Sequence, residues 1–357
     1  MRDFTREHDG DLVRFAVGAE PDMASLLVER GAARVLLVCQ GHHREGADRL
    51  ADALGERAVG VFAGVTRQVP ESVVQAALAE VDRTRPDWIL AHGGGSCVGV
   101  GKAIALERGI PIASVPTTYA GSERTSIYGF QLDGHKVTGR DEQVRPRLVV
   151  YDPSLTLPLP RDLSLVSLYN ALAHSLEALY ATSVTERALA AAEESLSPLV
   201  AGFRGIAADP DDLDARSEAT FGAYLASEAL DGASMALHHK LAHVLGGSFK
   251  TPHAQTHATL LPYTFAFNAV VAERARAAAQ RAWGTDDPAG FLHDLATEAG
   301  LSMSLRDLGL TEADVDRAAD LAAQGAYPNP RPLHRDGFHQ VLSAALSGVR
   351  PSFSETP

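Results

Sequence analysis

Short apolar runs alternate with amphipathic segments over the first third of the chain. The runs at 35–38, 59–62 and 88–91 have the length of buried strands. The segments at 45–54 and 71–83, which lie between them, repeat their apolar residues at helical spacing. This alternation predicts a mostly parallel sheet covered by helices, an architecture that binds ligands beyond the carboxyl ends of its strands.

The pattern changes after residue 127. An Asp-Gly pair between alternating residues predicts a β-hairpin over 129–137, and the apolar run at 148–151 predicts one more strand. The proline-rich segment 153–160 then indicates a domain boundary. We place the two domains at 1–158 and 159–357.

The second domain is predicted to be all-helical. Its segments are rich in Ala and Leu, and Gly, Pro or Asp separates them. Helices are expected over 162–182, 186–206, 213–230, 239–247, 257–268, 271–283, 288–299, 312–324 and 337–346. The predicted fold class is therefore an α/β domain with a parallel sheet followed by an all-α domain.

The stretch 87–122 contains the first candidate site. The strand at 88–91 runs into a glycine loop formed by Gly93, Gly94, Gly95 and Ser96, and a helix follows. Glycines let a ligand approach the backbone, and the N–H groups of a helix start, with Ser96 as the expected N-cap, attract an anion such as a diphosphate. A second loop, after the apolar run 110–115, carries the hydroxyl residues Thr117, Thr118 and Ser122.

These two loops predict a nucleotide site, and a tight turn between strand and helix is the alternative. The glycine loop alone does not decide between them, because it matches neither a P-loop nor the GxGxxG fingerprint. Cys97, which follows this loop, has two interpretations: a thiol activated by the helix start, or a small buried side chain, which we favour.

The charge balance of the chain narrows the classes of partner. There are 32 Lys and Arg residues against 45 Asp and Glu, for a formal net charge of −13. With no basic run, nucleic acid and anionic membranes are not expected as partners. Two cysteines, no apolar leader and no run of eighteen apolar residues predict a cytoplasmic protein.

Histidines in the second half form the other candidate site. Asn170 with His174, and His239 with His243, are each four residues apart, so each pair lies on one face of a helix. His253 follows a turn and can return to the same place. A single histidine on such a helix is usually a core residue, but five polar groups at these spacings predict a metal site or an acid–base cluster. Glu177 and Lys240, on the same helices, are expected to be paired or solvated surface charges.

Several motifs, taken together, resemble one enzyme family over essentially the whole chain. They are GGGS at 93–96 with GKAIAL at 101–106, PTTYAGSE at 116–123, TGRD at 138–141, YDP at 151–153, NALAH at 170–174, HHKLAHVLGG at 238–247, PHAQTH at 252–257 and NPR at 329–331. They are similar to those of the iron-containing (group III) alcohol dehydrogenases, which have a dehydroquinate synthase-like fold, and within that family to the maleylacetate reductase branch.

This resemblance implies reduction of maleylacetate to 3-oxoadipate, in the degradation of aromatic compounds, with NADH or NADPH. It implies a dinucleotide-binding first domain, a helical second domain, a catalytic cleft between them and a homodimer. Carried over by position, Gly94, Gly95 and Ser96 hold the diphosphate. The residues expected to line the nucleotide and nicotinamide are Thr117, Thr118 and Ser122.

The resemblance also implies roles for the polar residues of the second domain. The positions that bind iron or zinc in metal-using relatives read Asn170, His174, His239 and His253 here. A neutral amide is a poorer ligand for a divalent cation than a carboxylate, so metal-free chemistry is credible. His243 is then the first candidate proton donor, with His239, His253 and His257 orienting the substrate and Tyr119 donating from the nucleotide side.

The substrate is expected to be a small anion. Candidate partners for its carboxylates are Arg124, Lys136, Arg140 and Lys250. The segment 39–44 has no acidic residue for a ribose hydroxyl, and its Arg44 permits NADPH without excluding NADH.

Three alternatives remain open. His92, Arg124 and Ser126 depart from the reductase pattern, which favours a biosynthetic relative acting on another enone, carbonyl or alcohol. A non-catalytic nucleotide-binding scaffold would not need the histidines. A lyase of the dehydroquinate synthase type should keep a strong metal site, against which Asn170 argues.

Overall fold

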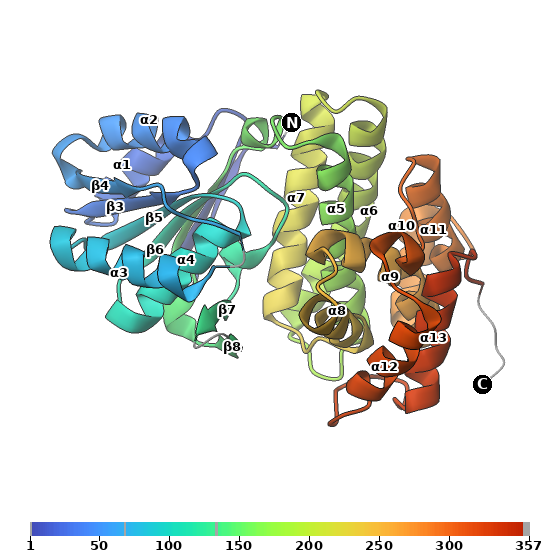
Figure 1. Ribbon diagram of the computed structural model, residues 1–357. Helices are drawn as coiled ribbons and strands as arrows, with labels where there is room; N and C mark the ends of the chain where they lie inside the picture. The colour runs from blue at the N-terminus through green and yellow to red at the C-terminus, as the bar shows by residue number, and fades with distance from the viewer. Residues whose placement is uncertain (1, 68, 133–134, 353–357) are drawn as a thin grey trace. The chain divides into compact units, whose positions relative to one another are not determined.

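The computed structural model of the protein describes residues 2–67, 69–132 and 135–352, with no side-chain detail over 131–136. The chain forms two compact units, Met1–Leu159 and Pro160–Pro357 (Figure 1). In the described ranges, no helix combines the length and the apolar character needed to cross a membrane.

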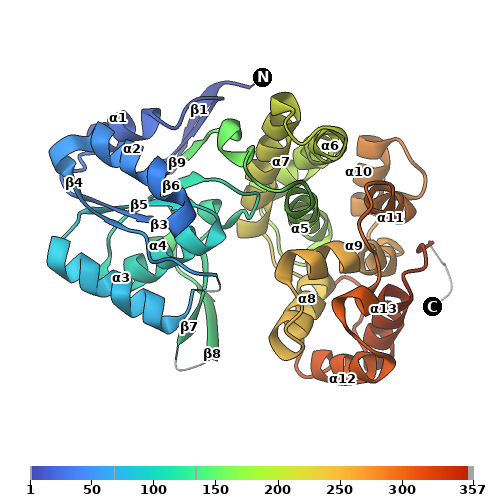
Figure 2. The ribbon, with the colours of Figure 1, turned by 45° about the horizontal axis from the view of Figure 1, so that its top comes forward.

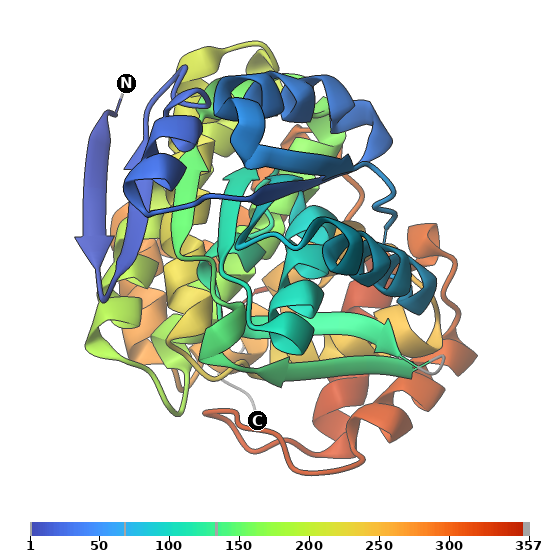
Figure 3. The ribbon, with the colours of Figure 1, turned by 90° about the vertical axis from the view of Figure 1, so that its left-hand side faces the viewer.

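Unit 1 is built on a seven-stranded sheet. Its strands in spatial order are β1 (Phe4–His8), β2 (Asp11–Phe15), β9 (Leu148–Tyr151), β6 (Ile112–Pro116), β5 (Trp88–Gly93), β3 (Val35–Cys39) and β4 (Ala58–Phe62). All neighbours pair in parallel except β1, which pairs antiparallel with β2 at one edge, where Figure 3 shows it in dark blue. The predicted parallel sheet is confirmed. The sequence did not reveal β1, because that strand is mostly exposed and has no apolar run.

Helices cover both faces of this sheet. On one face lie α1 (Asp22–Glu29) and α2 (Arg44–Leu54), and on the other α3 (Glu71–Thr84) and α4 (Gly95–Arg108) (Figure 1). The side chains of β3 alternate between two cores: Val35 and Leu37 pack with α1 and α2, whereas Leu36 and Val38 pack with α3 and α4. An uninterrupted apolar run therefore fits a strand that is buried on both faces.

A separate hairpin and several short turns complete unit 1. The two strands of the predicted hairpin are confirmed as β7 (Ile127–Leu132) and β8 (His135–Arg140), which pair antiparallel. The Asp-Gly turn predicted at 133–134 lies outside the described residues. Phe130 of β7 packs into the same core as α3 and α4. The short 3₁₀ turns are η1 (Gly41–His43), η2 (Gly55–Arg57), η3 (Ser122–Arg124), η4 (Glu142–Val144) and η5 (Pro153–Thr156).

Among the residues described in unit 2, all the named secondary-structure elements are helices, as predicted. The elements are α5 (Arg161–Tyr180), α6 (Glu186–Ala208), α7 (Leu213–Asp231), α8 (Leu237–Ser248), α9 (His253–Ala269), α10 (Glu273–Trp283), α11 (Pro288–Glu298), η6 (Leu305–Leu308), α12 (Glu312–Ala322) and α13 (Arg335–Ser347). The main difference is that α9 begins at His253, one turn before the predicted start at residue 257. Pro252 is the N-cap of α9. A proline is tolerated at the start of a helix, because the N–H that it lacks would have no intrahelical acceptor there.

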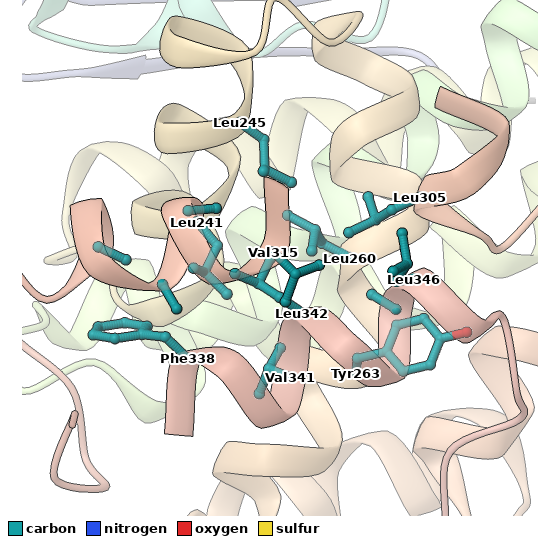
Figure 4. Close-up of a cluster of buried hydrophobic side chains, with 14 of the residues drawn as sticks. Leu241, Leu245, Leu260, Tyr263, Leu305, Val315, Phe338, Val341, Leu342 and Leu346 are labelled. Atoms are coloured by element: carbon teal, nitrogen blue, oxygen red, sulfur yellow. The ribbon is translucent and has the colours of Figure 1, made fainter. Parts of the chain in front are cut away.

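The helices of unit 2 pack in two groups. One group contains α5, α6 and α7, which Figure 2 shows packed side by side. In the other, side chains of α8, α9, α12 and α13 share one apolar core that includes Leu241, Leu260, Val315 and Leu342 (Figure 4). The two groups are linked by α5, which also packs against α9.

Glycines set the close approach of α6 and α7. A Cβ atom at Gly202 would lie 2.5 Å from the backbone nitrogen of Ala219, and one at Gly222 would lie 2.9 Å from the backbone nitrogen of Leu199. Because backbone atoms cannot move aside as a flexible side chain can, any larger residue must push the helices apart.

We expect Gly202→Ala to lower the free energy of unfolding by about 1–3 kcal/mol, the usual cost of overpacking a core. Gly247→Ala is the control, since a Cβ atom at that helical position meets nothing within 4 Å and should be neutral or stabilising. Urea unfolding of both variants would measure the difference, and equal stabilities would contradict this account of the packing.

Candidate active site

In unit 1 the two predicted loops lie next to each other. Gly93 at the end of β5 pairs with Pro116 at the end of β6, and the backbone N–H of Thr117 donates to the carbonyl of Gly93 at 3.3 Å. The loop after β3 lies on the other side of β5, because β3 pairs with β5 as well. The chain passes from β3 outward to β4 and then back to β5, so these loops flank a topological switch point, where α/β sheets bind ligands.

The glycine loop differs in one detail from its prediction. The N-cap of α4 is Gly94, and Ser96 lies inside the first turn, so the expected N-cap role of Ser96 is wrong. The neighbours of this loop leave little room for a side chain: a Cβ atom at Gly94 would lie 3.0 Å from the side chain of Thr118, and one at Gly95 would lie 3.2 Å from Cβ of Ala120. Small residues at these positions therefore favour the close approach of the loops after β5 and β6.

Three polar side chains beneath these loops were not predicted as a group. His92 is buried at the end of β5, and its Nε2 lies 2.8 Å from Oε1 of Glu20. His43, after β3, lies 3.2 Å through Nε2 from Oγ1 of Thr117, and burial lowers the pKa of His43 to about 4. The neutral imidazole of His43 thus contacts a residue of the candidate nucleotide loop. The sequence signal was weak, because these residues are far apart along the chain.

Several residues predicted near a ligand are buried and contact other residues of unit 1. The hydroxyl of Tyr119 is buried and donates to Thr156 at 3.1 Å, which favours a structural role. Arg124 is 4% exposed, and its guanidinium lies 3.8 Å from the carboxylate of Asp11. This partner favours a structural role for Arg124, and its role in substrate binding stays a prediction. Cys97 is buried and burial raises its pKa to about 12, as expected for an inert thiol.

The other candidate cations have different environments. Arg140 ends β8 and is exposed, and Lys250 is exposed after α8 with a positive φ of 56°. The side chain of Lys136 lies outside the described residues. None of these observations places a cation beside the histidines.

In unit 2, six histidines from three helices form one cluster. Ring centroids are 5.2 Å apart for His174 and His239, 6.0 Å for His239 and His243, and 5.0 Å for His239 and His257. His253 lies 4.4 Å from His257, and His238 lies 4.9 Å from it. The structure thus brings together the four histidines of the predicted site, together with His257 and with His238, which was not predicted as a site residue.

Glu177 on α5 holds the base of this cluster. Its carboxylate is fully buried and accepts the backbone N–H groups of Ala236 at 3.0 Å and His238 at 2.7 Å, and it lies 2.6 Å from Nδ1 of His239. The interpretation of Glu177 as a surface charge is wrong. The signal available in the sequence was its spacing, because Glu177 lies on the same face of the helix as Asn170 and His174.

A second side chain fixes the start of α8. Asn329 Oδ1 accepts the backbone N–H of Leu237 at 3.2 Å. The amides of Asn329 and Asn268 also exchange two hydrogen bonds, of 2.9 and 2.7 Å. Glu177 and Asn329 therefore satisfy the first N–H groups of the helix that carries His238, His239 and His243, and Asn329 ties that helix to α9.

The segment before Asn329 also reaches the surroundings of this site. Burial, followed by the charge of Glu177, raises the pKa of Tyr327 to about 12. The ammonium of Lys240 lies over the ring of Tyr327 and donates to the carbonyl of Gln324 at 3.3 Å. The ammonium of Lys240 is thus an exposed charge, as expected, that also contacts a ring and a carbonyl.

Burial controls the charge of the cluster. It lowers the pKa of His174, His238 and His257 well below the ordinary value, and the neighbouring histidines lower it further. These three imidazoles are therefore neutral near pH 7. His243, on the next turn of α8 after His239, is exposed and can exchange protons with solvent.

The four positions that correspond to metal ligands in metal-using relatives are Asn170, His174, His239 and His253. Asn170 Oδ1 and His174 Nδ1 are buried and have no hydrogen-bond partner among the described residues, so a ligand or a water would satisfy them. Among all the residues that the structure describes, no group of three or more His, Cys, Asp or Glu side chains is arranged to hold a metal ion. The neutral amide also supplies no compensating charge. These residues do not fit a resident metal.

Two family models match the chain along most of its length. Residues 12–153 match the iron-containing alcohol dehydrogenase model, and residues 165–346 match the C-terminal model of the Fe-containing alcohol dehydrogenase family. The chain belongs to the iron-containing alcohol dehydrogenase family.

Named relatives are similar over nearly the full length. A maleylacetate reductase from Burkholderia cepacia is 45% identical over 95% of this chain and 97% of its own. Crystal structures of maleylacetate reductases from Agrobacterium tumefaciens and Rhizobium sp. strain MTP-10005 are each 36% identical to this chain, with a TM-score of 0.93. Each match covers 98% of this chain, together with 100% of the Agrobacterium chain and 99% of the Rhizobium chain. The chain is an NAD(P)H-dependent oxidoreductase that resembles these reductases.

We expect Glu177→Gln to lower the free energy of unfolding by about 1–3 kcal/mol, the cost of leaving buried donors unsatisfied. The amide offers one acceptor oxygen in place of two and turns an N–H group toward other donors. Thermal and urea unfolding would measure the loss, with Glu298→Gln, an exposed carboxylate at the end of α11, as the control. Wild-type stability in Glu177→Gln would contradict the role of this carboxylate as an anchor.

Proposed function

We propose that the protein reduces maleylacetate to 3-oxoadipate with NADH or NADPH. The observation that carries this proposal is the cluster of six histidines anchored on Glu177, in a chain 45% identical to a maleylacetate reductase. A non-catalytic scaffold would not need so many imidazoles in one place, because burying polar groups costs free energy that apolar side chains would not.

We assign cofactor binding to the domain over residues 1–158. Gly94, Gly95 and Ser96 hold the diphosphate through the backbone at the start of α4, and the hydroxyl loop with Thr117, Thr118 and Ser122 lines the nucleotide and nicotinamide. The bound cofactor supplies a hydride. Arg44 is exposed and paired with Asp48 at 2.7 Å, which gives no reason to exclude either NADH or NADPH.

We assign proton transfer to the domain over residues 159–357. Hydride addition to the unsaturated oxo-diacid leaves an enolate, which needs a positioned acid. His243 is the proposed donor, since it is exposed and its ring is 6.0 Å from that of His239. His239, held by Glu177, and His253 with His257 orient the substrate.

The charge of the substrate, the cellular compartment and the oligomeric state are proposed from the same resemblance. The substrate is a small anion, and the protein acts as a cytoplasmic homodimer. His92, Arg124 and Ser126, the three departures that favoured a different substrate, are all buried in unit 1. Another enone, carbonyl or alcohol stays the alternative substrate, which the assay with maleylacetate distinguishes.

The first test is oxidation of NADH and NADPH by metal-stripped protein with freshly made maleylacetate, followed at the nicotinamide absorbance and repeated after adding iron or zinc. We expect one cofactor oxidised per product in both conditions, because no proposed step uses a metal. Turnover only with metal would overturn the metal-free chemistry, and no turnover despite cofactor binding would overturn the substrate assignment.

We expect His243→Asn to lower kcat by about 10²–10⁴-fold, the usual contribution of a general acid. The dissociation constant for NADH should not change, since His243 lies in unit 2. His8→Asn, at an exposed histidine of β1, is the control. A kcat within about twofold of wild type would exclude His243 as the donor.

A further inference from the structure

Three buried side chains form a continuous hydrogen-bonded chain on one side of the histidine cluster. Thr264 Oγ1 lies 2.9 Å from His238 Nδ1, and His238 Nε2 lies 2.8 Å from His257 Nδ1. The remaining nitrogen of His257, Nε2, is also buried and has no hydrogen-bond partner among the described residues. The chain therefore links helices α8 and α9 and ends at an unused nitrogen.

The direction of these hydrogen bonds is set by Thr264. A neutral imidazole carries one N–H, so the chain has two possible directions. The Thr264 hydroxyl donates within its own helix, to the carbonyl of Leu260 at 3.1 Å or of Leu261 at 3.2 Å, as threonine commonly does in helices. The hydroxyl oxygen is then left to accept from Nδ1–H of His238, and Nε2 of His238 must accept from Nδ1–H of His257.

The opposite direction is less favourable. In it, the Thr264 hydroxyl donates to His238, which in turn donates to His257, so two hydrogen bonds form where the first direction makes three. It also leaves a buried N–H at His257 Nε2 without an acceptor among the described residues. Buried donors are seldom left unpaired, because the lost hydration is not replaced.

We propose that Thr264 and His238 are positioning residues that hold His257 as its Nδ1–H tautomer and present its Nε2 atom to the ligand site as a hydrogen-bond acceptor. The proposed role in turnover rests on the function proposed above. The tautomer itself depends only on the contacts within unit 2.

This assignment separates the roles of the histidines. The ring of His257 lies 4.4 Å from that of His253 and 5.0 Å from that of His239, so it belongs to the same cluster. An acceptor at this position orients an N–H of a neighbouring imidazole or a bound water. It cannot itself protonate the enolate, so the proton must come from another residue of the cluster.

The tautomers can be observed directly by two-bond ¹H–¹⁵N correlation spectra of protein labelled with ¹⁵N-histidine, assigned with His238→Asn and His257→Asn variants. We expect both His238 and His257 to carry their proton on Nδ1 in the wild-type protein. A proton on Nε2 of His257 would overturn the proposal. This measurement needs no substrate, so it stands whether or not maleylacetate is reduced.

Thr264→Val tests the positioning role, because it keeps the shape of the side chain and removes the hydroxyl. We expect the Nδ1–H signal of His257 to be lost or split and kcat to fall roughly tenfold or more, with an unchanged KM for NADH. Thr264→Ser, which restores the hydroxyl, should recover the spectrum and kcat to within about twofold. A folded Thr264→Val protein with the wild-type spectrum and kcat would overturn the proposal.

If maleylacetate is not a substrate, the function proposed above fails while the spectra still decide the tautomer. The kinetic comparison would then use whichever enone the protein reduces. Failure of the proposed function and failure of this inference are thus distinguishable.

Discussion

The carboxylate of Glu177 accepts two backbone N–H groups from the start of α8 and lies against Nδ1 of His239. A buried carboxylate is costly unless its oxygens are fully hydrogen-bonded, and here α8 supplies the donors. In return the same oxygens fix where α8 begins and how His239 is turned. Since α8 carries His238, His239 and His243, the geometry of the whole cluster depends on this one anchor.

The remaining contacts of the cluster extend the same arrangement to α9. Asn329 holds the N–H of Leu237 and pairs with Asn268, and His238 reaches His257 and Thr264. Glu177, Asn329 and His238 are each hydrogen-bonded to a group on another element, so hydrogen bonds as well as packing hold the α8 and α9 histidines in place. Such a network gives a unique arrangement of polar groups in a core where apolar contacts would tolerate several.

In unit 1 the candidate binding residues lie on the loops that follow the strands of the sheet. The central strands of its sheet are buried on both faces, and sheets of this kind bind ligands through the loops at the carboxyl ends of the strands. Small residues at Gly94 and Gly95 favour the close approach of the loops after β5 and β6. The backbone of α4 therefore begins at a place where an anion can reach its N–H groups.

The sequence by itself determined the alternation of strands and helices, the hairpin, the helical second half and the histidine spacings, because these depend on local periodicity. It could not place Glu177, Arg124 or Tyr119. A charged or polar residue on an amphipathic segment has the same local pattern whether it faces water or a partner far along the chain. Only the tertiary structure decided that Glu177 lies under α8, that Arg124 faces Asp11, and that Thr264 contacts His238, since burial and long-range hydrogen bonds arise when the elements pack.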